Sequence, residues 1–106
     1  MTLPTSPVPA TDGWKLEAPV TKFIAVPASS NWLILLDHMF TPRHSSNLLC
    51  VDGNGVERWR ASLPTSPDSF VDVKAVENSI FAWTWSCYRL EINVDTGATI
   101  SMEFTK

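Results

Sequence analysis

The sequence predicts an all-β fold, and two observations support that prediction. Between residues 14 and 104, short segments of β-forming residues alternate with turn residues such as Pro, Gly, Asn and Asp. No window of about 11 residues holds an apolar stripe at helical spacing. The 106 residues are 44% hydrophobic and 18% charged. The hydrophobic fraction is enough for a buried core, and the length allows one domain but is too short for two ordinary ones.

Each expected strand ends at a recognisable turn signal. A first segment, residues 14–18, stops at Pro19, and a second, residues 21–26, stops at Pro27. Residues 31–37 are mostly apolar, as is typical of a strand that is buried on both faces. The remaining strands are expected at residues 47–52, 56–61, 70–76, 80–85, 88–94 and 99–104.

Turn and linker composition sets the expected boundaries. Asn54-Gly55, between two of these strands, is the strongest short hairpin signal in the chain. Residues 1–13 are rich in Pro, Thr and Ser, so we expect a flexible N-terminal arm there. Residues 14–106 are then expected to form a single all-β domain.

An internal repeat divides this domain. Residues 47–59 align with residues 88–100, each copy being a strand, a glycine turn and a second strand. We therefore predict two four-stranded antiparallel meanders, one over about residues 20–62 and one over about residues 69–106. Trp14-Lys-Leu-Glu-Ala-Pro also parallels Trp59-Arg-Ala-Ser-Leu-Pro, which predicts an extra N-terminal strand.

The repeated segment resembles the repeat of quinoprotein (PQQ-like) β-propellers. The resemblance rests on Leu48-Leu-Cys-Val-Asp-Gly-Asn-Gly-Val-Glu-Arg-Trp-Arg, and Leu90-Glu-Ile-Asn-Val-Asp-Thr-Gly is similar. In the second copy Ile100 stands where a Trp would be expected. The resemblance covers about residues 14–104 and implies blade-like sheets, that is, a partial propeller. It implies no particular function, since such repeats serve enzymes, assembly factors and scaffolds. A quinone cofactor is not expected, because the chain has no adjacent cysteine pair and such enzymes use a much larger ring.

Two blades cannot close a ring, because propellers typically need four to eight. A single copy would then expose apolar faces and unpaired strand edges. Three arrangements would cover them: a symmetric oligomer of several chains, a compact sandwich of the two sheets, or completion of a partner's structure.

Composition excludes several classes of function. Eight Lys and Arg against 11 Asp and Glu give a net charge of −3 without a basic run, so neither nucleic acid nor an anionic membrane is an expected partner. The longest apolar run, residues 32–36, is far shorter than a membrane span, and the N-terminus lacks the pattern of a secretory signal. Cys50 and Cys87 are not spaced as CxxC, so we expect reduced thiols and a cytoplasmic location.

No motif in the chain predicts catalysis. Asp37, His38 and His44 would need at least one more ligand to hold a metal, and the turn after Asp52 departs from the calcium-loop pattern. A G-x-S-x-G nucleophile motif and glycine-rich phosphate loops are missing from the sequence. We therefore predict no catalytic residue, metal or cofactor. Six acidic residues from position 68 onward are expected at solvated positions that alternate with core ones; these are Asp68, Asp72, Glu77, Glu91, Asp95 and Glu103.

Aromatic residues and one polar loop are the candidates for binding. Trp83 and Trp85 alternate, so in a strand both indoles would lie on one face, either as packing between sheets or as a platform for a ligand or protein. The candidate interaction residues are Trp14, His38, Met39, Phe40, Arg43, His44, Trp83 and Trp85.

The expected function is a non-enzymatic protein-interaction module that self-assembles into a small propeller-like oligomer. Two alternatives stay open. One is an immunity-type protein that neutralises a basic toxin through its surplus carboxylates. The other is a small-ligand or enzyme site on the axis of the oligomer.

Overall fold

The computed structural model describes residues 18–26, 29–39, 41, 46–65, 67–77 and 79–105. These residues form eight strands and contain no helix, which confirms the predicted all-β class. No helix long and apolar enough to cross a membrane occurs among them. The strands are β1 (Val20–Ala25), β2 (Trp32–Leu36), β3 (Leu48–Val51), β4 (Glu57–Arg60), β5 (Phe70–Val76), β6 (Ser79–Thr84), β7 (Tyr88–Ile92) and β8 (Thr99–Phe104).

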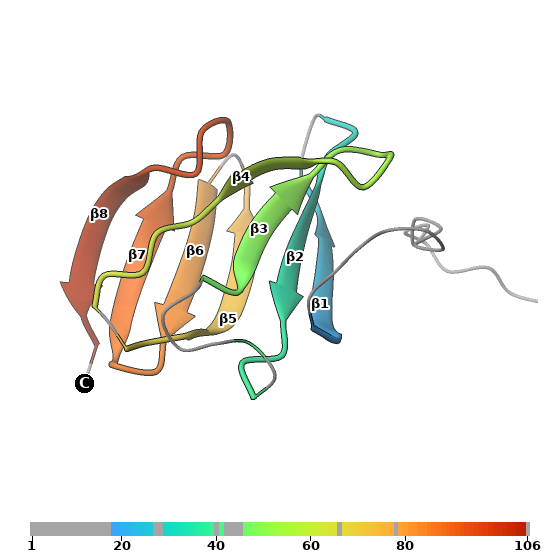
Figure 1. Cartoon of the computed structure of the whole chain (residues 1–106). Helices are drawn as coiled ribbons and strands as arrows, with labels where there is room; N and C mark the ends of the chain where they lie inside the picture. Colours follow the sequence, from blue (N-terminus) through green and yellow to red (C-terminus); the bar gives the residue numbers. More distant parts are fainter. Residues whose placement is uncertain are drawn as a thin grey trace, which may run out of the picture.

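The strands form two four-stranded antiparallel sheets, ordered β1-β2-β3-β4 and β5-β6-β7-β8. Each strand therefore pairs with its neighbour in the chain, as a duplicated meander requires (Figure 1). The sheets do not close into a barrel, and their arrangement is compatible with two blades of a propeller. The expected arm at residues 1–13 and nearly all of the expected extra strand at residues 14–18 fall in the part of the chain that the structure does not describe.

The first sheet is buried on both faces at its centre. In β2, residues Leu33 to Leu36 are all buried, and so are all four residues of β3. The apolar composition of β2 explains this result, because a strand covered on both sides needs no polar face. The second sheet differs: β6 alternates strictly between buried and half-buried residues, so only one of its faces is covered.

The core lies between the two sheets. Leu33, Leu35, Leu48 and Cys50 of the first sheet belong to the same buried cluster as residues of the second sheet. The residues from the second sheet are Phe70, Val73, Ile80, Ala82, Leu90 and Ile92. This shared core accounts for most of the hydrophobic stabilisation, since neither sheet buries this face without the other.

Asn47 connects the sheets by hydrogen bonds at one end of this core. Its amide nitrogen donates to Phe70 O at 2.8 Å and Leu36 O at 2.9 Å, and its amide oxygen accepts from Phe70 N at 2.8 Å. The side chain thus satisfies both backbone groups of Phe70, as a neighbouring strand would. Asn47 is itself only 1% exposed, so these bonds are shielded from water.

Trp59 makes a second connection from β4 to the turn between β7 and β8. Its indole Nε1 donates to Val94 O at 3.1 Å, and its ring lies against Gly97. A Cβ atom on Gly97 would lie 2.4 Å from Trp59 Cε3, and Gly97 has a φ of 78°. Only glycine meets both conditions, because L side chains rarely adopt this φ and none would fit beneath the ring.

The third connection joins β1 to β5, the first strand of each sheet. Lys22 Nζ lies 2.9 Å from Asp72 Oδ1 and 2.8 Å from Val73 O. Both side chains of this ion pair are substantially exposed, so it fixes geometry more than it stabilises the fold.

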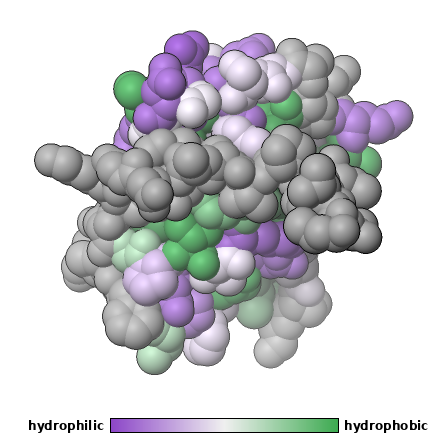
Figure 2. Space-filling view, turned by 90° about the vertical axis from the view of Figure 1, so that its right-hand side faces the viewer, coloured by the Kyte–Doolittle hydropathy of each residue, from purple (hydrophilic) through white to green (hydrophobic). Residues whose placement is uncertain are grey.

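The outer faces of the two sheets are chemically different. On the first sheet, Ile34, Leu36, Leu49 and Val51 are at most 2% exposed and pack with Phe23 and other half-buried residues. Figure 2 looks at the molecule from the side of β1 and shows hydrophobic side chains near the centre of this face. On the second sheet, the outer face carries Asp72, Lys74, Arg89, Glu91 and Glu103. The outer face of the first sheet is therefore buried at its centre, whereas the outer face of the second sheet carries these charges beside the half-buried Phe81 and Trp83.

Candidate functional site

A buried carboxylate organises one end of the molecule. Asp68 lies in the linker between β4 and β5 and is 2% exposed, which corrects the expectation that it would be solvated. Its Oδ2 accepts from Thr65 Oγ1 at 2.7 Å and Ser86 Oγ at 2.5 Å, while its Oδ1 accepts from the backbone nitrogens of Ser69 and Ser86. Four donors thus replace the water that burial removes. The carboxylate ties the linker to the turn between β6 and β7.

The protonation state of Asp68 follows from these bonds. Burial acts to raise the pKa of its carboxyl group, but the hydrogen bonds from Ser86, Thr65 and the backbone outweigh it, so the pKa lies below its ordinary value. Asp68 is therefore ionised at neutral pH, although it is almost completely covered.

The turn that Asp68 holds presents an exposed tryptophan. Cys87 N donates to Thr84 O at 3.1 Å, Tyr88 N donates to Thr84 Oγ1 at 3.2 Å, and Cys87 has a φ of 73°. Trp85 sits inside this turn with its backbone nitrogen bonded to Ser69 O, yet its side chain is 63% exposed. The large indole of Trp85 is thus held in solvent on a tightly hydrogen-bonded turn, which makes it a candidate binding residue.

The segment after β2 reaches the same place. Asp37 Oδ1 accepts from Met39 N at 2.8 Å, and Thr41 Oγ1 donates to Asp37 O at 3.0 Å, which shapes the start of this loop. The His38 ring lies 5.9 Å from the Trp85 ring, centroid to centroid, and Met39 is 74% exposed. We call His38, Met39 and Trp85 the end surface. The loops that carry it both leave the lower ends of their strands in Figure 1.

The structure thus brings together some of the predicted interaction residues and separates others. His38 and Trp85, 47 positions apart in the chain, are in ring contact. Trp83 is half-buried on the outer face of the second sheet, opposite Asp72 and Arg89, and β6 ends before Trp85, so the strict alternation does not reach it. The predicted residues Trp14, Phe40, Arg43 and His44 are not among those the structure describes.

Sequence reasoning missed the residues that hold this surface in place, namely Asp68, Ser86 and Thr65. A usable signal was present in Thr65-Ser66-Pro67-Asp68, where a carboxylate follows a hydroxyl at turn spacing. Its second partner, Ser86, is 18 positions away, and no local pattern reports that contact.

The two cysteines lie in different environments. Cys50 is buried between the sheets, and burial raises the pKa of its thiol to about 11, opposed by the nearby Arg58. Its environment thus favours the neutral thiol, which packs as a small apolar group. Cys87 is exposed in the turn beside Trp85. Within the described ranges, no three His, Cys, Asp or Glu side chains lie close enough together to hold a metal ion.

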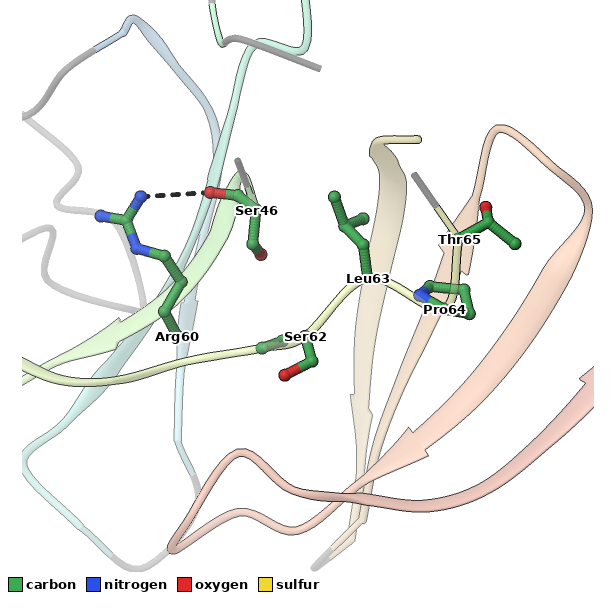
Figure 3. Close-up of a pocket in the computed structure, with 7 residues that line it drawn as sticks. Ser46, Arg60, Ser62, Leu63, Pro64 and Thr65 are labelled. Carbon is green, nitrogen blue, oxygen red and sulfur yellow. Dashed lines mark hydrogen bonds between the residues drawn. The ribbon is translucent and has the colours of Figure 1, made fainter. Parts of the chain in front are cut away.

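An open hollow of about 530 Å³ lies between the linker and the start of β3 (Figure 3). Arg60 and Leu63 lie on opposite sides of it. The Arg60 guanidinium donates to Ser46 O at 3.1 Å and pairs with Glu57 at 2.9 Å, so its charge is already engaged within the chain. Leu63 packs against the core. The lining therefore offers a ligand little that is both polar and uncommitted.

The comparisons with known proteins give one match. The model of a family described as "Domain of unknown function (DUF7957)" matches residues 11–104. No curated protein and no solved structure matches the chain.

Proposed function

The chain belongs to the DUF7957 family, a domain of unknown function, and from its surface we propose that it is a non-enzymatic protein-interaction module. The observation that carries this proposal is the end surface, where Trp85 is 63% exposed and in contact with His38. Tryptophan and methionine are enriched at protein interfaces, where they bury a large area on binding.

The rigidity of the end surface supports the same proposal. The Asp68 carboxylate and the Ser69 carbonyl hold the turn that carries Trp85, so little conformational entropy remains to be lost when a partner binds. A partner with an apolar pocket for the indole and an acceptor for the His38 ring fits this chemistry.

Two further properties belong to the proposal. Self-association, expected from the incomplete ring of two sheets, remains a prediction. To close such a ring, a second copy would have to pack on an outer face, which is already buried on the first sheet and charged on the second. A cytoplasmic location fits the two free thiols, because reduced cysteines persist in a reducing compartment.

The test compares proteins retained by the immobilised wild-type chain and by a Trp85→Ala variant. We expect a specific partner to be retained by the wild type and lost with Trp85→Ala, while the melting temperatures of the two chains stay close because the indole is exposed. Val76→Ala, which truncates another exposed apolar side chain, is the matched control and should retain the partner. Retention of the same proteins by the wild type and Trp85→Ala would refute a role for the end surface.

A further inference from the structure

The edge strand β8 exposes a regular apolar row. All six of its residues are exposed, and Ile100, Met102 and Phe104 are 50–59% exposed. Their partners across the sheet, such as Met102 with Leu90 and Phe104 with Tyr88, place this row on the core-facing side of the second sheet. The row therefore continues the apolar core past the area that the first sheet covers.

Two of these residues, Met102 and Phe104, also carry outward-facing backbone groups. Thr105 N donates to Cys87 O at 2.7 Å, so residue 105 directs its backbone groups toward β7. Because these directions alternate along the regularly paired part of an antiparallel strand, residues 101 and 103 also face β7, whereas 102 and 104 face the open edge. In Figure 1 no other strand lies beyond β8 on that side.

The other three sheet edges carry features that discourage pairing with another chain. β1 and β5 each contain a bulge near their first residue, as β8 does, but β1 and β5 are also tied to each other by Lys22 and Asp72. β4 has only four residues, three of them charged. β8 has six residues and one charge, Glu103, which is paired with Arg89, and its bulge lies at its N-terminal end, between Thr99 and Ser101. Among the described strands β8 is thus the edge least protected against pairing.

We propose that β8 pairs antiparallel with β8 of a second copy, about a two-fold axis at Met102, to form a continuous eight-stranded sheet. This inference rests on the proposed function in one respect, since it makes self-association one of the interactions of the module. It assigns that role to β8, away from the end surface.

Backbone geometry and side-chain chemistry together restrict the register and favour one centred on Met102. Only even-numbered residues of β8 direct their backbone groups outward, so even residues must face even residues across the new pair. Centring the pair on Met102 places Ile100 opposite Phe104 of the second copy, twice, and Met102 opposite its equivalent. It also places Glu103 opposite Ser101. If the two-fold axis lay at Glu103 instead, the two Glu103 side chains would face each other, and this pairing of like charges is unfavourable.

Concentration-dependent mass is the first test. Three side chains per copy form a small contact, and interfaces that bury less than about 1,200 Å² are weak. We expect sedimentation or light scattering to show the mass rising from 11.8 kDa toward twice that value as protein concentration increases. Met102→Lys should raise the dimer dissociation constant at least tenfold, because two Lys residues would face each other at the axis. Val76→Lys, which places the same charge on an exposed residue of β5, is the control and should dimerise normally.

A cross-link tests the register. In a Cys87→Ser background, which removes the exposed thiol, Met102→Cys should form a disulfide-linked dimer under mild oxidation, since the Cα atoms of a hydrogen-bonded antiparallel pair lie about 5.5 Å apart. Thr99→Cys should not, because its two copies would lie about 20 Å apart along the strands. Retained melting temperatures in every variant would show that folding is intact.

The outcomes separate this inference from the proposed function. A wild-type chain that stays at 11.8 kDa at all concentrations, or a dimer that Met102→Lys leaves unchanged, would overturn the β8 pairing. Neither result would bear on the proposed function, which is tested separately by the loss of partner binding in Trp85→Ala. A cross-link from Thr99→Cys equal to that from Met102→Cys would overturn the register.

Discussion

Gly97 is the residue whose replacement should distort the fold most directly. Its φ of 78° and its contact with the Trp59 ring leave no room for a methyl group. We expect Gly97→Ala to lower the free energy of unfolding by about 2–4 kcal/mol, through backbone strain and displacement of the indole from Val94. Equilibrium urea unfolding measures this change.

Gly53 supplies the matched control. A Cβ atom there would meet Ser30 O at an ordinary distance of 3.7 Å. Gly53→Ala should therefore change the free energy of unfolding by less than about 1 kcal/mol. Equal losses from the two substitutions would show that the contact between Trp59 and Gly97 does not hold the sheets.

Asp68 makes stability depend on pH in the acidic range. Its pKa is lower in the folded chain than in the unfolded one, so the unfolded state binds the proton more tightly. The contribution of Asp68 is then fully present above the unfolded pKa, about 4, and is lost as the pH falls through the lower folded pKa. We expect the urea midpoint to fall between about pH 5 and pH 2, and Asp68→Asn to be less stable at pH 7 with a shallower acid dependence.

Asp72 separates this effect from a general one. The hydrogen bond from Lys22 lowers its pKa, but both side chains of the pair are largely exposed. Asp72→Asn should therefore cost at most about 1 kcal/mol at pH 7 and keep most of the acid dependence. If Asp68→Asn retained the full acid dependence of the wild type, the assignment to Asp68 would be wrong.

Among the elements, β8 should exchange its amide hydrogens in an alternating pattern. Residues 101, 103 and 105 face β7, whereas 102 and 104 face the open edge. In dilute protein, hydrogen exchange followed by NMR should show protected odd-numbered amides and fast-exchanging even-numbered ones. At high concentration the even-numbered amides should gain protection if β8 pairs. Uniform protection along the strand in dilute protein would contradict the assigned pairing.

The positions of the strands could be predicted from the sequence. All eight strands described lie within a residue or two of their predicted ranges, because alternation and turn residues are local signals. The turn after Asp52 illustrates this: the Asp52 carboxylate accepts from Asn54 N and Val56 N, and Gly55 takes a φ of 84°. All of these contacts lie within five residues of one another.

Contacts between elements could not be predicted from the sequence in the same way. The expected candidates included His38 and Trp85, but not their contact, which depends on how two loops from different sheets converge. Asp68 was misjudged because burial depends on Ser86, in a turn formed by other strands. Alternation along a strand reports its faces, but not what covers each face.

For the whole molecule, one core shared by two sheets implies a single cooperative transition. Asn47 contributes by satisfying Phe70 N, Phe70 O and Leu36 O, all away from water. Asn47→Ala would leave these groups unpaired, and we expect it to lower the free energy of unfolding by about 3 kcal/mol or more.

Coincident unfolding curves from tryptophan fluorescence and far-UV circular dichroism would confirm cooperativity in the wild type. Asn54→Ala, in an exposed turn, is the control and should be nearly neutral. Separate transitions for the two probes in the wild type would show that the sheets unfold independently.

The strand order has a consequence for synthesis on the ribosome. Because each strand pairs with the one just before it, the first meander can form as soon as Arg60 has emerged from the exit tunnel. The core-facing side of the first sheet, with Leu33, Leu35 and Leu48, then remains exposed to solvent until the chain has been synthesised to about Ile92. At 5–20 residues per second this interval lasts a few seconds, and during it the nascent chain is a natural client for a chaperone.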